Sequence, residues 1–192
     1  MSAAAAPFGL RPSYHPSGTI RPTNSTIASG YASNIYLGSP VGYIADGTIA
    51  LSAAGGTGVA GAVGSFQGVE YTPSVAGSRR VYSNTWPASM AADDIVAYLT
   101  EDPLIVYTIQ ANATLTRAAV GQQYDWSTNG SANGNTTTGI SSVSLDVASA
   151  AANAGLRVLG LTGGPDNDWG DAFPIVDVQL SEHQFVATIA SI

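Results

Sequence analysis

The sequence predicts an all-β protein with very little helix, in which an extended N-terminal arm precedes a β-barrel or β-sandwich. Short apolar runs alternate with turn residues from residue 33 onward, at the spacing typical of barrels and sandwiches. Val176, Val178 and Leu180 alternate with polar residues, as in a strand with one solvated face. Helical periodicity is weak, because the best candidate, residues 149–154, has six residues before Gly155.

The predicted strands are short and bounded by Gly, Pro, Asn and Asp. Asp46-Gly47 separates two of them and predicts a two-residue hairpin turn, since glycine accepts a positive φ. The run 104–109 is nearly all apolar and predicts a strand buried on both faces. The full set of predicted strands is 33–37, 41–45, 48–52, 69–72, 79–83, 95–100, 104–110, 143–147, 156–161, 174–180 and 184–189.

Residues 1–32 are predicted to form the arm. Prolines recur every four to six residues between positions 7 and 22, which favours an extended chain over a helix. Apolar side chains punctuate the segment, whereas a disordered linker rarely carries such anchors. The arm is therefore expected to lie on a surface, either of a partner or of its own domain. The predicted interface residues are Phe8, Leu10, Arg11, Tyr14, Ile20 and Arg21.

The rest of the chain divides by composition. Residues 33–118 are predicted to form the β-barrel or β-sandwich body, and residues 119–192 a second small β-unit or a continuation of the body. Two segments rich in small residues, 53–64 and 127–139, are expected to be mobile loops unless a partner covers them.

Charge and composition exclude several functional classes. Charged residues make up 10% of the chain, with six arginines, no lysine and thirteen acids, for a net charge of −7. Nucleic-acid binding needs clustered cations, so no nucleic-acid partner is expected. The chain has no cysteine, which excludes disulfides and thiolate sites. No stretch approaches the roughly 20 apolar residues of a membrane helix, and no membrane partner is expected. A weakly charged surface suits broad contacts with other proteins.

The residues that could carry chemistry do not form a convincing site. Residues 56–61 match G-x-G-x-x-G, but the glycines that follow leave no room for the required helix, so no cofactor is predicted. His15 lies among prolines and His183 between two predicted strands, and no G-x-S-x-G accompanies them. The aspartates of residues 166–171 could surround Ca²⁺, although a Gly-Pro turn explains them equally. No catalytic or metal-binding residue is predicted.

Several segments, taken in order, resemble small structural proteins of tailed phages known as head decoration or cement proteins. The segments are 6–18 (APFGLRPSYHPSG), 66–72 (FQGVEYT), 84–87 (NTWP), 102–111 (DPLIVYTIQA), 120–125 (VGQQYD) and 160–171 (GLTGGPDNDWGD). The resemblance implies a homo-oligomer, a trimer being favoured, assembled in the host cytoplasm. It implies that the protein sits on the capsid exterior and clamps subunits of the major capsid protein. It implies no active site.

Capsid stabilisation without enzymatic activity is therefore the function expected from the sequence. One alternative is a carbohydrate-binding virion surface or fibre module, which an exposed Trp126 or Trp169 beside a shallow groove would favour. A second alternative is a hydrolase built from distant carboxylates, such as those of residues 93–94 and 101–102.

Overall fold

A computed structural model describes residues 2–53 and 61–186, and thirteen strands lie within these ranges. The expected all-β class is confirmed, since the strands pair in antiparallel sheets and the two 3-10 helices described have three residues each. The sheets of the described residues are open, and no closed barrel forms. The elements are β1 (Arg11–Tyr14), β2 (Thr23–Ser25), β3 (Ile35–Tyr36), β4 (Pro40–Tyr43), β5 (Ile49–Leu51), β6 (Gly64–Pro73), β7 (Val81–Ser83), β8 (Thr85–Trp86), β9 (Ala92–Thr100), β10 (Val106–Gln110), η2 (Arg117–Ala119), β11 (Gln123–Tyr124), η3 (Val147–Ser149), β12 (Leu156–Leu161) and β13 (Ile175–Leu180).

A six-stranded sheet forms one half of the molecule. Its order is β2-β9-β6-β4-β5, β7 pairs with β6, and β3 and β8 form a separate pair. The two longest strands, β6 and β9, pair with two register shifts along β6, which increase the local twist. Phe66, Val69 and Leu99 are fully buried on the inner face, and Trp86 packs edge-on against Tyr71 at 5.3 Å.

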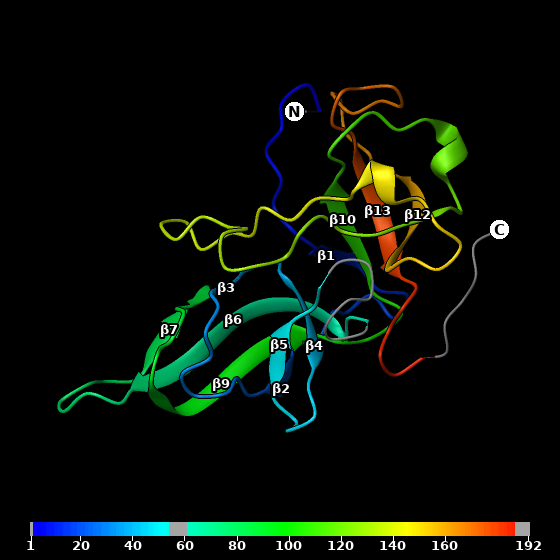
Figure 1. Ribbon diagram of the computed structural model, residues 1–192. Helices are drawn as coiled ribbons and strands as arrows, with labels where there is room; N and C mark the ends of the chain where they lie inside the picture. Colours follow the sequence, from blue (N-terminus) through cyan, green and yellow to red (C-terminus); the bar gives the residue numbers. More distant parts are fainter. Residues whose placement is uncertain (1, 54–60, 187–192) are drawn as a thin grey trace.

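A five-stranded sheet forms the other half, in the order β1-β10-β13-β12-β11 (Figure 1). The predicted alternation in β13 is confirmed, because Val176, Val178 and Leu180 are buried and the residues between them are half-buried. The predicted two-faced burial holds for the strand from Tyr107 to Gln110, whereas Leu104 is exposed. This half has a hydrophobic core of its own.

The chain passes from one half to the other between Thr100 and Val106. The buried Tyr107 hydroxyl of β10 donates to the Thr100 carbonyl of β9 at 2.9 Å, so a hydrogen bond spans this junction. The boundary expected between residues 118 and 119 lies between strands of one sheet, because β10 pairs with β13. Composition does not reveal such pairing between distant segments.

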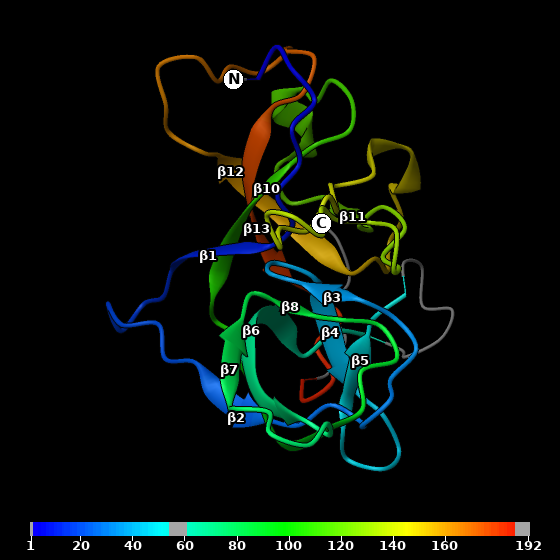
Figure 2. The same ribbon diagram turned by 90° about the vertical axis from the view of Figure 1, so that its left-hand side faces the viewer.

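The N-terminal arm contributes a strand to each half of the molecule. β1 pairs with β10, and β2 pairs with β9, so the arm supplies one edge strand to each sheet (Figure 2). Leu10 is fully buried in the core of the five-stranded half, and Ile27 is buried in the other core. Of the two alternatives for the arm, the structure has it wrapped over its own chain.

The segment expected to be a mobile loop, 127–139, is tied to the six-stranded half. The Asn129 side chain donates to the carbonyls of Pro40 and Ser52, both at 2.7 Å. The Tyr36 hydroxyl donates to the Ser131 carbonyl at 2.9 Å. Gly134 lies against the Tyr36 ring, where a Cβ would come within 2.2 Å of a ring carbon. The chain itself therefore covers much of this loop.

The predictions for single turns and short segments are confirmed in some places and wrong in others. A hairpin forms at Asp46-Gly47 with Gly47 at φ 80°, but the two-residue loop is wrong, because Ile44 N donates to Thr48 O and residues 45–47 lie between them. The weak helix signal at 149–154 corresponds to no helix there, since the three-residue 3-10 turn ends at Ser149. The predicted strand 143–147 forms only isolated bridges at Leu145. Residues 184–186 are not a strand, while 187–189 and most of the 56–61 glycine motif lie outside the described residues.

Candidate interaction surface

The six predicted interface residues do not all face outward. Leu10 is fully buried and Ile20 packs against the core of the five-stranded half, so these two stabilise the fold itself. Phe8 is half-buried, and Tyr14 is 56% exposed. Arg11 and Arg21 are exposed. The part of the arm that a partner could reach is therefore smaller than the sequence suggested.

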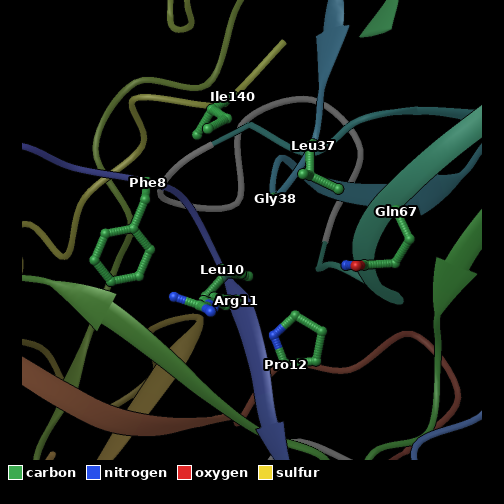
Figure 3. A pocket seen from close by; sticks show the side chains of 8 residues that line it. All are labelled: Phe8, Leu10, Arg11, Pro12, Leu37, Gly38, Gln67 and Ile140. Atoms are coloured by element: carbon green, nitrogen blue, oxygen red, sulfur yellow. The ribbon is translucent and has the colours of Figure 1, made fainter. Parts of the chain in front are cut away.

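An open hollow of about 460 Å³ lies beside the arm, and we call it the arm hollow. Figure 3 shows the arm passing through it, with Phe8 and Ile140 to one side and Leu37 and Gln67 to the other. Its lining comes from four parts of the chain: the arm, the turn that precedes β4, strand β6, and residue 140 at the end of the loop. The lining residues are Phe8, Leu10, Arg11, Pro12, Leu37, Gly38, Gln67 and Ile140.

Backbone contacts hold the arm at this hollow. Leu10 N donates to Gly38 O at 2.8 Å, and Gly9 N donates to Val143 O at 3.0 Å. Gly9 has φ 76°, and a Cβ there would come within 2.4 Å of Gly38 O. Only glycine tolerates both the backbone conformation and the close approach. The hollow is therefore a preformed feature of the fold.

A second hollow continues the surface past Phe8. Phe8 and Ile140 line both hollows, and the second extends over Ala6, Pro7 and the loop around Asn135. Arg11 is the one charged residue in the lining of either hollow. The combined surface can offer an apolar contact area with little charge to desolvate.

The sequence did not reveal the contributions of Leu37, Gln67 and Ile140 to this surface. Ile140 is 40% exposed although it is a large aliphatic residue, and nothing in its local sequence separates it from a core residue. The arm brings these residues together through contacts between segments far apart in the chain.

The two histidines take part in different contacts. His15 Nδ1 accepts from Ser17 Oγ at 2.7 Å, and Nε2 lies 3.3 Å from Asp102 Oδ2. These contacts join Ser, His and Asp, but with the ring nitrogens exchanged, since a triad's Nε2 contacts the serine and its Nδ1 contacts the aspartate. The Ser17 backbone N–H also donates to Nδ1, at 3.1 Å, whereas a triad's serine uses that group in the oxyanion hole. The contacts instead close the turn from His15 to Gly18.

His183 links the two halves of the molecule. It is buried, its Nε2–H donates to the Glu101 carbonyl at 3.0 Å, and its Nδ1 accepts from Phe185 N at 3.2 Å. Desolvation by burial lowers the pKa of His183, opposed by its hydrogen bonds to backbone carbonyls. The neutral ring is therefore the form that fits this site.

The paired carboxylates do not converge. Glu101 Oε2 accepts from the Tyr43 hydroxyl at 3.2 Å, whereas Asp102 faces His15. Asp93 accepts from Ser74 Oγ at 3.0 Å. Neither adjacent pair forms the facing couple that a glycosidase needs.

Side-chain hydrogen bonds fix the shape of the aspartate-rich turn 166–171. Asp171 Oδ2 accepts from Asp168 N at 2.9 Å and from the Ser2 hydroxyl, and these hydrogen bonds lower the pKa of Asp171. Asn167 is buried and bonds the backbone of Thr162 and Ile175. Within residues 2–53 and 61–186, no group of three or more His, Asp or Glu side chains is arranged to hold a metal ion.

The carbohydrate-binding alternative depended on an exposed Trp126 or Trp169, and neither side chain is largely exposed. Trp86 and Trp126 are buried, and Trp126 Nε1 donates to the Ser52 carbonyl at 3.3 Å. Trp169 packs against the core of the five-stranded half and is half-buried. A carbohydrate site at Trp126 is therefore ruled out by its burial.

Comparisons of the chain with protein-family models, with curated proteins and with solved structures find no match. In the part of the chain that the structure describes, no helix has the length and apolar character needed to cross a membrane.

Proposed function

We propose that this protein is a non-enzymatic structural protein of a tailed-phage virion. It sits on the capsid exterior and fastens neighbouring subunits of the major capsid protein by non-covalent contacts. The observation that carries this proposal is the arm hollow, which is preformed, open and largely apolar. An apolar segment of a capsid subunit would fill it, with Phe8 and Ile140 as the principal contacts.

The setting on a phage head is supported by the resemblance of six ordered segments to head decoration proteins. The same resemblance favours a homotrimer assembled in the host cytoplasm. Repetition by symmetry then compensates for weak single contacts, because linked sites bind far more tightly than separate ones. A small apolar surface on each copy is enough for stable decoration.

Cosedimentation with capsids that lack the protein tests this proposal. We expect Ile140→Ser to weaken capsid binding roughly ten-fold, the size of effect typical of a contact near the centre of an interface. Val75→Ser is the matched control, because Val75 is an exposed β-branched residue (70%) that lines none of the hollows described above. Equal binding by wild type and Ile140→Ser would show that the arm hollow is not the capsid contact.

A further inference from the structure

We propose that a third hollow, between the β7–β8 segment and residues 136–139, is a binding site for a neutral oligosaccharide. The hollow has a volume of about 550 Å³, within the range of roughly 300–1,000 Å³ of ordinary ligand sites. We call it the threonine hollow. It is lined by Asn34, Tyr82, Ser83, Asn84, Thr85, Pro87, Thr136, Thr137, Thr138 and Gly139.

The lining of the threonine hollow has the chemistry of a sugar site. None of its residues is charged, and seven of the ten carry an aliphatic hydroxyl or a side-chain amide. Hydroxyls and amides both donate and accept hydrogen bonds, as do the neighbouring hydroxyls of a sugar ring. A charged ligand would lose hydration here without gaining an opposite charge. A neutral polyhydroxylated ligand is therefore the best match.

Tyr82 supplies an aromatic wall on which the apolar face of a sugar can stack. Its side chain is 60% exposed, and its hydroxyl donates to Gln67 O at 3.3 Å. The ring lies over Gly68, where a Cβ would come within 2.7 Å of the Tyr82 hydroxyl. An exposed but oriented ring loses little conformational freedom when a ligand binds.

A second tyrosine supports the first. The rings of Tyr82 and Tyr98 lie 6.3 Å apart at 47°, within the separation at which aromatic pairs interact. The Tyr98 hydroxyl donates to Glu70 Oε1 at 3.0 Å, and Arg80 Nε donates to Glu70 Oε2 at 2.9 Å. The charged pair thus holds Tyr98 in place without lining the threonine hollow.

The opposite wall is also fixed. Asn135 Oδ1 accepts from the backbone N–H groups of Thr137 and Thr138, at 2.8 and 3.2 Å. Gly139 has φ 71°, and a Cβ there would come within 2.7 Å of Thr85 Oγ1. This close approach seats the threonine segment against β8. The threonine side chains remain exposed and available to a ligand.

Saturation-transfer NMR on the full chain tests the proposal with maltotriose, cellotriose and chitotriose as neutral probes and trigalacturonic acid as the anionic comparison. We expect at least one neutral trisaccharide to bind and the anionic one to bind more weakly. Tyr82→Ala should weaken binding about ten-fold, whereas Tyr82→Phe, which keeps the stacking face and loses only the hydrogen bond to Gln67 O, should weaken it much less.

Tyr14→Ala is the matched control, because Tyr14 has a similar exposure of 56% but does not line the threonine hollow. It should leave sugar binding unchanged. The proposal is overturned if no neutral trisaccharide binds at millimolar concentration, if Tyr82→Ala binds as wild type does, or if Tyr82→Ala lowers capsid binding alone. These measurements use free sugars, so they do not depend on the capsid proposal.

Discussion

Single buried side chains hold the two halves of this molecule together at the residue scale. Tyr107 and His183 both bond backbone carbonyls at the end of β9. Their partners, Thr100 and Glu101, are adjacent where the chain leaves the six-stranded half. A change that breaks the hydrogen bond of either side chain therefore weakens the contact between the two halves.

We expect His183 to make stability fall as the solution becomes acidic. Its pKa is lowered in the folded protein from the ordinary value of 6.5, so the unfolded chain binds more protons below that pH. The stabilisation is complete above about pH 6.5 and is lost as pH falls toward the lowered pKa. Protonation would also remove the Nδ1 lone pair that accepts from Phe185 N.

Thermal melts between pH 7.5 and 5.5 measure this effect. His183→Gln cannot titrate, so its melting temperature should vary less with pH than that of wild type. Val75→Ser is the control, because it changes an exposed side chain and leaves His183 in place, and it should keep the wild-type slope. Identical slopes for wild type and His183→Gln would contradict the role given to His183.

At the scale of secondary-structure elements, the N-terminal arm contributes both to the stability of the fold and to the arm hollow. It supplies an edge strand to each sheet and places Leu10 in one core and Ile27 in the other. An arm of this kind stabilises the free protein as well as presenting Phe8 and Arg11 at the arm hollow. Its removal is therefore expected to affect folding before it affects binding.

Leu10→Ala should lower the free energy of unfolding by about 2–5 kcal/mol, because it removes a buried side chain and leaves a cavity. Tyr14 lies four residues further along the same arm and is 56% exposed. Tyr14→Ala should therefore change the free energy of unfolding by no more than about 0.5 kcal/mol. Urea denaturation of the two variants gives both values. A Leu10→Ala protein as stable as wild type would mean that the arm does not dock in solution.

Sequence patterns predicted the elements that depend on neighbouring residues. The alternation in β13 and the glycine of the Asp46-Gly47 turn are local signals, and both predictions were confirmed. β1 and β2 were not predicted as strands, because prolines flank or interrupt them and their pairing partners lie 72 to 97 positions away. The Asn- and Ser-rich loop suggested mobility, yet Asn129 and Ser131 bond the six-stranded half.

The candidate site was only partly predictable for the same reason. Phe8 and Arg11 were identified from the arm's composition and do line the arm hollow. Leu10 is apolar like Phe8 but is buried. The sequence does not show which apolar side chains of the arm face outward and which point into the core. Ile140 and Tyr82 face outward through contacts that only the folded chain creates.

The whole molecule combines two large open sheets, each with its own core, a two-stranded sheet of β3 and β8, and a surface with few charges. Six cations and thirteen anions in 192 residues leave few groups for ion pairs, and the Arg80–Glu70 pair joins two partly exposed side chains. Exposed ion pairs contribute about 0–1 kcal/mol each, whereas apolar burial contributes roughly 25 cal/mol per Å² before association costs. Binding to a partner should therefore depend on apolar contact.

Cosedimentation of wild-type protein with capsids across a salt series tests this central claim most directly. Salt screens charges, with a Debye length of about 3 Å at 1 M, and scarcely weakens apolar contacts. We predict that the protein stays on the capsid at about 1 M NaCl. Release at moderate salt would contradict the account and would point to an electrostatic interface through exposed arginines such as Arg11, Arg21 and Arg79.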